Sequence, residues 1–131
     1  MEKSHLNPKT LHTPFSTYSH GIKISGAREI IFCAGQVAGD ENGNIVGKGD
    51  FWAQGHQVMA NLKDVLAEGG ATFADIVKAT IFVVGQENAQ PGRDLCGEYF
   101  DKDNPPANTL VVCQGLADPD FLVEVQAIAV I

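Results

Sequence analysis

Apolar and polar residues recur with helical spacing over one long stretch of the chain. This stretch runs from Phe51 to Leu66, begins after Asp50, a residue suited to an N-cap, and stops before Gly69 and Gly70. Apolar residues three and four positions apart place a single apolar face along a helix. The pattern therefore predicts an amphipathic helix between Asp50 and Gly69.

A second, weaker helical pattern extends from Gln86 to Asp101. A Pro-Gly pair interrupts its start, and a Pro-Pro pair shortly after it stops it. Between the two helices, Thr72 and Asp75 resemble a capping box, so one short helical turn is predicted there. The chain is thus expected to contain two helices, of which the first is the better defined.

Five runs rich in β-branched and aromatic residues predict strands. In chain order they cover residues 20–24, 29–37, 76–84, 109–113 and 121–131. Residues 25–27 predict a hairpin between the first two strands, and residues 40–44 predict a turn after which residues 45–46 return briefly as strand. Residues 1–17 are expected to be loop-like, with residues 1–14 as an N-terminal segment of a single domain that spans residues 1–131.

The order of the elements predicts an α+β fold with a mixed sheet. A strand–helix–strand unit favours parallel pairing, whereas hairpins require antiparallel pairing. Two amphipathic helices can cover only one face of such a sheet. The last strand is nevertheless largely apolar on both faces, with Val123 and Val125 on one side and Ile128 and Val130 on the other. We therefore expect a second copy of the chain to cover the free face.

Composition excludes several classes of function. The chain carries a net charge of −7, and its nine Lys and Arg residues form no cluster, which argues against nucleic acid as a partner. Nothing resembles a signal peptide or a membrane span. The three cysteines and four histidines have no metal-binding or disulfide spacing, so no metal is expected and a reducing, cytoplasmic location is predicted. The reactivity of Cys33, Cys96 and Cys113 stays open.

Glu124 is the first candidate for chemistry, because a carboxylate inside an apolar strand is costly unless it is paired, hydrogen-bonded or protonated. It is either a satisfied glutamate at an edge or interface, or a general acid/base or water-positioning group at a subunit boundary. Tyr18 precedes the first strand and is either a packing residue with a hydrogen-bonded hydroxyl or a functional residue. Asn108 opens a strand, and Arg93 is one of only two arginines; both residue types also occur commonly on surfaces.

Several short motifs, in the same order, resemble those of the Rid (YjgF-type, reactive-intermediate deaminase) family. The resemblance starts at about residue 14 and is carried by residues 18–22, 31–37, 75–83, 98–100, 105–107 and 122–130. It implies a chorismate-mutase-like fold, in which two helices cover one face of a mixed sheet, and a homotrimer whose sheets form a central barrel. It also implies hydrolysis of small enamines or imines to a keto acid and ammonia, without a cofactor, in clefts between subunits.

The resemblance implies catalytic roles for Glu124 and Tyr18 and a substrate-binding role for Gly35, but it also has gaps. Where the family has an arginine that grips the substrate carboxylate, this chain has Asn108, which cannot offer a charged bidentate contact. The family serine before Gly35 is Ala34. Gap-free alignment places Arg93 at a cleft position in the second helix, which gives the hypothesis that a cation has moved within the substrate-binding cleft.

Three functions stay open at this point. The first is a hydrolytic deaminase acting on an imine or enamine that differs from 2-aminoacrylate. The second is a trimer that binds a small molecule or regulates without catalysing a reaction. The third is an endoribonuclease or translation inhibitor, which the acidic charge argues against. The identity of the substrate is not determined by the sequence.

Overall fold

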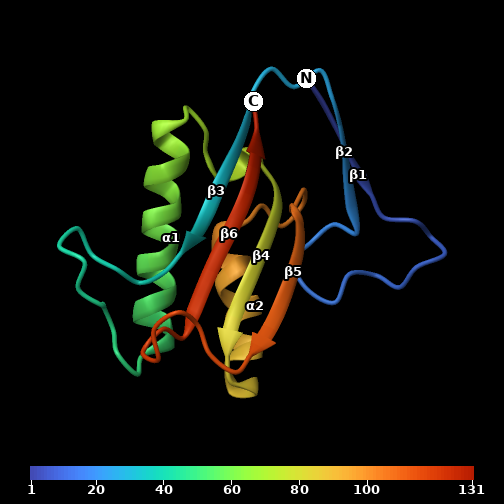
Figure 1. Ribbon diagram of the computed structural model, residues 1–131. Coiled ribbons are helices and arrows are strands. Elements are labelled where there is room, and N and C mark those ends of the chain that lie inside the picture. The colour runs from blue at the N-terminus through green and yellow to red at the C-terminus, as the bar shows by residue number, and fades with distance from the viewer.

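The computed structural model describes residues 1–131 and contains a four-stranded mixed sheet with two helices on one face (Figure 1). Across the sheet, the strands are β3 (Ile30–Gln36), β6 (Val123–Val130), β4 (Ile76–Val84) and β5 (Ala107–Cys113). β4 pairs in parallel with β5 and antiparallel with β6, and β6 pairs antiparallel with β3. The predicted α+β class and mixed sheet are confirmed.

The first helix, α1 (Phe51–Glu68), is bounded as its sequence predicts. The Asp50 side chain accepts a hydrogen bond from the backbone N–H of Ala53 at 3.1 Å, which satisfies one of the free donors of the first turn. Gly69 caps the other end, and Gly70 follows with a φ of 76°, a conformation that favours glycine. The boundaries of α1 therefore follow from local chemistry.

The second helix begins later than predicted. Residues Gln86–Asn88 form a 3-10 turn, η2, and α2 covers only Ala89–Tyr99. Pro91 therefore lies in the first turn of α2, where backbone N–H groups have no partner within the helix, so it interrupts nothing. The capping box of Thr72 and Asp75 is present and opens the 3-10 turn η1 (Phe73–Asp75).

The N-terminal segment differs from the expectation. Residues Glu2–Leu6 form a strand, β1, which pairs antiparallel with β2 (Gly21–Ser25) in a separate two-stranded sheet. The hairpin expected at residues 25–27 is absent, because β2 pairs with β1 and not with β3. The chain instead crosses the end of β6, where the N–H groups of Arg28 and Glu29 donate to the carbonyl of Ile131 at 2.8 and 2.9 Å. Residues 45–46 make only an isolated bridge, Gly39 with Ile45.

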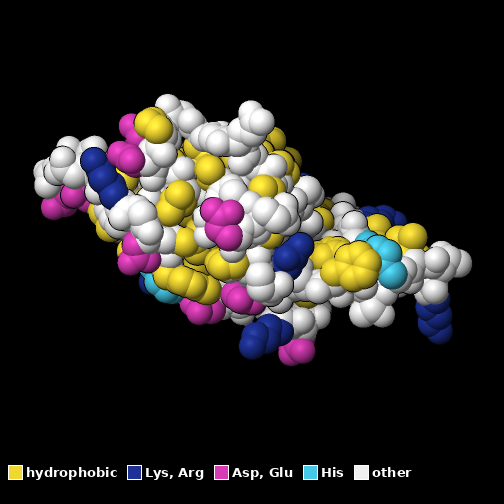
Figure 2. Space-filling view, turned by 90° about the horizontal axis from the view of Figure 1, so that it is seen from below, with side chains coloured by type: hydrophobic (Ala, Val, Ile, Leu, Met, Phe, Trp, Pro, Cys, Tyr) yellow, Lys and Arg dark blue, Asp and Glu magenta, His cyan; other side chains and the backbone are white.

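Charged side chains are dispersed over the surface. On the face that Figure 2 shows, the Lys and Arg side chains lie apart and form no basic patch. The only salt bridge joins Lys48 to Asp120 at 3.4 Å, and both side chains are largely exposed.

None of the helices combines the length and apolarity required to cross a membrane.

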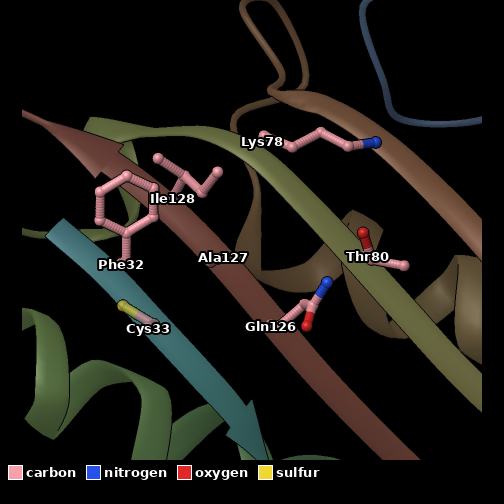
Figure 3. A pocket seen from close by; sticks show the side chains of 7 residues that line it. All are labelled: Phe32, Cys33, Lys78, Thr80, Gln126, Ala127 and Ile128. Carbon is pink, nitrogen blue, oxygen red and sulfur yellow. The ribbon is translucent and has the colours of Figure 1, made fainter. Parts of the chain in front are cut away.

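The face of the sheet without helices carries both polar and apolar side chains. Phe32 of β3 is 75% exposed there and lies beside Ile128 of β6, with Gln126, Thr80 and Lys78 across the neighbouring strands (Figure 3). A Phe side chain left this exposed has lost the stabilisation that burial of an aromatic ring provides. This face therefore offers an apolar surface that nothing within the chain covers.

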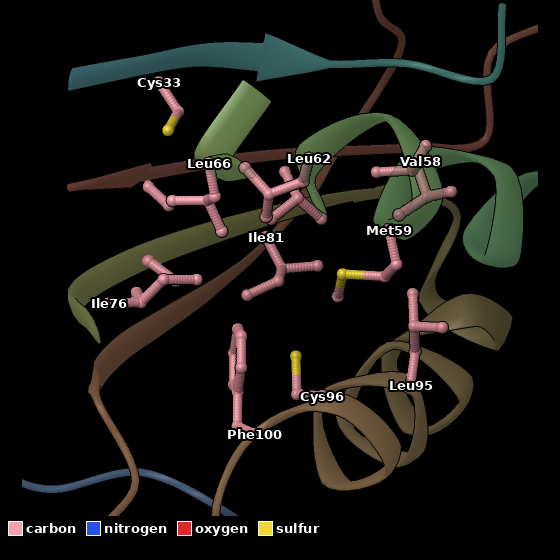
Figure 4. Close-up of a cluster of buried hydrophobic side chains, with 14 of the residues drawn as sticks. Cys33, Val58, Met59, Leu62, Leu66, Ile76, Ile81, Leu95, Cys96 and Phe100 are labelled. Atoms are coloured by element: carbon pink, nitrogen blue, oxygen red, sulfur yellow. The ribbon is translucent and has the colours of Figure 1, made fainter. Parts of the chain in front are cut away.

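The other face forms the core. α1 contacts β3 and β6, and α2 contacts β4 and β5 (Figure 1). The side chains between these layers come from both helices and from alternate strand positions, and most are fully buried (Figure 4). Gly92 allows α2 to approach the sheet closely, since a Cβ atom there would lie 2.9 Å from Leu110 Cδ1. The position of α2 on β5 in turn shapes the cavity described below.

Candidate functional site

A cavity of about 300 Å³ lies where the N-terminal segment, α2 and β5 meet. Its lining combines aromatic, polar and cationic side chains, a composition typical of small-molecule sites. The residues are Phe15, Ser16, Tyr18, Arg93, Cys96, Asn108, Thr109 and Leu110. Three residues selected from the sequence, Tyr18, Arg93 and Asn108, thus line one cavity although they are far apart along the chain.

Asn108 enters the cavity from the start of β5. It pairs with Ala79, whose side chain is fully buried beneath the helices, so Asn108 lies on the helix-covered side of the sheet and reaches Cys96 of α2. Its Oδ1 atom is buried without a hydrogen-bond partner. A buried acceptor of this kind costs free energy until a donor reaches it. Asn108 is therefore suited to accept a hydrogen bond from a bound ligand.

Arg93 supplies the positive charge of the cavity. It is half-buried on α2, and its closest polar contact is Nη1 with Gln90 Oε1 at 3.5 Å, the limit of hydrogen-bond distance. It makes no salt bridge. An open groove beside it also contains Asp94 and Glu98, which lower the positive potential there. The guanidinium nevertheless keeps donors available for an anionic ligand.

Tyr18 is held in place by its neighbours on the N-terminal segment. Its hydroxyl accepts a hydrogen bond from the backbone N–H of Phe15 at 3.2 Å, and its ring meets that of His20 edge-on. The buried Ser19 fastens the segment to the start of β5, because its hydroxyl donates to the carbonyl of Pro105 at 2.7 Å. The Tyr18 ring is therefore presented to the cavity by a fixed backbone.

Glu124 lies elsewhere, against Gly35. A Cβ atom at Gly35 would approach Glu124 Oε1 to 2.0 Å, so only glycine leaves room for the carboxylate in this position. Glu124 and Gly35 belong to the neighbouring strands β6 and β3, and the preceding residue, Ala34, is exposed. The structure thus brings together Glu124 and Gly35, two further residues that the resemblance selected.

The two groups of residues are separated within one chain. Asn108 is level with Ala79 of β4, whereas Glu124 is level with Phe82, three residues further along. β5 and β6 lie on opposite sides of β4, which places the Cα atoms of Asn108 and Glu124 roughly 14 Å apart. Glu124 also points to the helix-free face, and Asn108 to the other. A single chain therefore does not bring Glu124 to the cavity.

Sequence reasoning did not select the five other residues that line the cavity, nor Lys78 on the helix-free face. Cys96 and Leu110 line the cavity because α2 packs on β5, and neither has a polar pattern to reveal it. Lys78 lies on the helix-free face, where its Nζ donates to Thr109 Oγ1 at 2.8 Å and partial burial lowers its pKa. β4 and β5 are parallel, and Thr80 pairs with Thr109. Lys78 precedes Thr80 by two residues and shares its face of the sheet, so knowledge of this register would have placed Lys78 near Thr109.

Comparisons with known proteins agree with this geometry. Residues 10–131 match the family model described as Endoribonuclease L-PSP. The chain is 34% identical over 119 residues to the RutC family protein slr0709 of Synechocystis, which covers 90% of this chain and 88% of that protein. The chain is a member of the Rid family. Its fold is similar over the whole length to that of the Rid protein YyfB of Yersinia pestis, with a TM-score of 0.89, 36% identity and 100% coverage of both chains.

A second Rid protein of Yersinia pestis, YyfA, is more distant, with a TM-score of 0.72 and 30% identity over 99% of this chain and 100% of that one. Both Yersinia proteins are described as being of unknown function. Membership of the Rid family supports a general role in the deamination of reactive intermediates. The substrate and the roles of individual residues stay predictions.

The Cys96 thiol should remain unreactive at neutral pH. Burial raises its pKa to about 11, and a hydrogen bond with the Asn108 side chain offsets only part of that effect. Because the thiolate is the nucleophile, the folded protein should alkylate at Cys96 with iodoacetamide at pH 8 far more slowly than the urea-unfolded protein, by about tenfold or more. Peptide mass spectrometry measures both rates. Equal rates in the folded and unfolded states would show that Cys96 is accessible and ionised.

Proposed function

We propose that this protein hydrolyses a small imine or enamine to a carbonyl compound and ammonia, without a cofactor, in clefts between the subunits of a homotrimer. The observation that carries the proposal is the cavity in which Tyr18, the unpaired Arg93 and the buried acceptor of Asn108 meet. Glu124, held against Gly35 on another part of the sheet, would complete the site from a neighbouring subunit.

The residues of the cavity indicate the substrate class. Arg93 can bind a carboxylate, in place of the arginine that the family carries where this chain has Asn108. Asn108 Oδ1 can accept a hydrogen bond from an imine or iminium N–H, which would satisfy an atom that is otherwise buried without a partner. The cavity of about 300 Å³ restricts the ligand to a small molecule. We therefore expect a 2-imino or 2-enamino acid.

The chemistry needs only water and one base. An enamine first becomes the imine by gaining a proton at its β-carbon and losing one from its nitrogen. Water adds to the imine carbon, its oxygen forming the new C–O bond while the nitrogen takes up a proton, and a carbinolamine results. Glu124 accepts the proton that the attacking water loses and passes it to the nitrogen. In the second step Glu124 takes the proton of the carbinolamine hydroxyl and again delivers it to the nitrogen. The C–N bond then breaks, the C–O bond becomes a carbonyl, and ammonia leaves. The contribution of the protein is chiefly to hold water and substrate together and to stabilise charge.

The need for a second chain follows from the sheet. Glu124 and Asn108 lie on opposite faces and at different levels of the same sheet, so one chain cannot place both on one small molecule. The helix-free face, with Phe32 75% exposed, is an apolar surface suited to contact between copies. A closed trimer built through this face would form the central barrel that the family resemblance implies.

A binding protein without turnover is the second candidate, favoured by the replacement of the family arginine with Asn108. Such a protein would be stabilised by a ligand as the concentration of that ligand rises above its Kd, without releasing ammonia. The experiment below separates the two. An RNA substrate is not proposed, because the net charge is −7 and the cations visible in Figure 2 are scattered.

Arg93→Gln should lower kcat/KM for a carboxylate-bearing imine by about 10- to 100-fold, since a hydrogen bond to a charged group contributes about 1.5–3 kcal/mol. The imine is generated in situ by an amino-acid oxidase, and ammonia release is followed. Arg28→Gln, which removes the only other arginine, is the matched control and should leave kcat/KM unchanged, because Arg28 is exposed and outside the cavity.

Imines that lack a carboxylate should react at the same rate with wild type and Arg93→Gln. Equal activity of Arg93→Gln and wild type on every imine would remove Arg93 from the site. No acceleration by the wild-type protein on any imine, together with a ligand-induced rise in Tm, would establish the binding protein instead.

Gly35→Ala should abolish most of the acceleration, because its Cβ atom would displace the Glu124 carboxylate. We expect a loss of about 100-fold or more, comparable to removal of a general base. Gly39→Ala is the matched control, since a Cβ atom there meets nothing within 4 Å. Ammonia release and Tm are measured for both variants. Full activity in a folded Gly35→Ala protein would contradict the assigned position of Glu124.

A further inference from the structure

The β3 edge of the main sheet is unpaired. β3 pairs with β6 on one side only. At the start of this pairing, Glu29 and Ile131 donate to each other's carbonyls at 2.9 and 3.1 Å, which makes them a hydrogen-bonded pair of the antiparallel ladder. Such pairs alternate with non-hydrogen-bonded ones. The backbone N–H and C=O groups of Ile30 and Phe32 therefore point away from β6, toward the open edge.

The side chains along this edge are also unprotected. Ile30 is 58% exposed and Phe32 is 75% exposed. An exposed edge with apolar side chains is a template for pairing with another strand, and proteins usually cover or block such an edge. No proline, bulge or lysine blocks the edge at Ile30 and Phe32. The edge is consequently suited to receive a strand.

β2 has an open edge of its own. It pairs with β1 on one side, and nothing pairs with its other side. We call residues 1–25, which contain both strands, the arm. The arm lies beyond β5, at the side of the sheet opposite to β3 (Figure 1). It is held there by Ser19, which bridges to Ala107, and by Lys3, whose Nζ donates to the carbonyl of Ala74 at 2.9 Å.

The contrast between local sequence and structure suggests where the arm belongs. Residues 25–27 are typical of a hairpin turn, and only residues 26–29 separate β2 from β3, yet the two strands do not pair. Local sequence favours a hairpin between β2 and β3, but in the structure β2 extends away from β3. Such an arrangement is found when identical chains exchange an element. Two complementary open edges then exist in every chain.

We propose that the arm of one chain pairs, through the free edge of β2, with the edge of β3 in a second copy of the chain. Around a closed ring, each chain gives one arm and receives one, so the open edges of every β2 and every β3 are paired. The exchange also fixes which chain supplies which residue. Tyr18 stays with Asn108 and Arg93 of its own chain, while the strands of the arm extend the sheet that carries Gly35 and Glu124 of the neighbour.

The placement of the arm recurs in a relative. A TM-score of 0.89 over the whole of this chain and of YyfB requires the N-terminal residues to superpose together with the rest. The arm position is thus a shared feature of two chains that are 36% identical.

The test uses the full chain with the photoreactive residue p-benzoylphenylalanine in place of Lys23, an exposed residue of β2. Chains of natural isotopic composition and chains labelled with 15N are unfolded together, refolded and irradiated. Mass spectrometry then identifies the crosslinked peptides. We expect crosslinks from residue 23 to the peptide that contains Ile30 and Phe32, about half of them between labelled and unlabelled chains in an equal mixture. The same substitution at Lys9, in the loop between β1 and β2, is the control and should not label β3.

Crosslinks to β3 found only between peptides of the same label would show an ordinary hairpin within one chain. An absence of crosslinks to β3 would show that the arm does not reach that edge. Amide hydrogen exchange of the unsubstituted protein gives an independent measurement, because the proposal requires the amides of Ile30 and Phe32 to be protected as in a paired strand. Rapid exchange at both would overturn it. None of these readouts depends on ammonia release, so they fail or succeed separately from the proposed activity.

Discussion

The structure depends on one constraint: two helices can cover one face of a four-stranded sheet and no more. α1 and α2 bury the side chains of alternate strand positions, which accounts for the core. The opposite face has no such layer, and Phe32 is left 75% exposed on it. One face of the sheet is therefore packed and the other is left open, which supports the proposed assembly with further copies.

The same constraint explains where the chemistry lies. Side chains in the middle of the helix-covered face are committed to packing, so polar groups are found near the ends and edges of strands. Asn108 lies near the start of the edge strand β5, whereas Gly35 lies near the end of β3, the opposite edge strand, beside Glu124. The two groups of candidate residues therefore occupy opposite sides of one sheet. Only an arrangement that places one side of a chain against the other side of its neighbour can join them.

Local patterns predicted the parts of the fold that local chemistry determines. α1 follows from its N-cap Asp50 and its terminal glycines, and β4 from a run of β-branched residues that ends at Gly85. The arm was missed because β1 is largely polar, and because the pairing of β2 depends on distant contacts of Ser19 and Lys3. Family resemblance selected Tyr18, Arg93 and Asn108, but their meeting in one cavity depends on how α2 packs on β5, which no local pattern contains.

The most direct test of the account is complementation between two variants with impaired activity. Arg93→Gln chains keep Glu124, and Glu124→Gln chains keep Arg93; the two are mixed in equal amounts, unfolded, refolded and assayed for ammonia release. If each site combines Arg93 of one chain with Glu124 of another, roughly a quarter of the sites in random trimers regain both residues, and activity well above that of either variant returns. Activity no higher than the mean of the two separate variants, in mixed trimers verified by mass spectrometry, would contradict a site shared between chains.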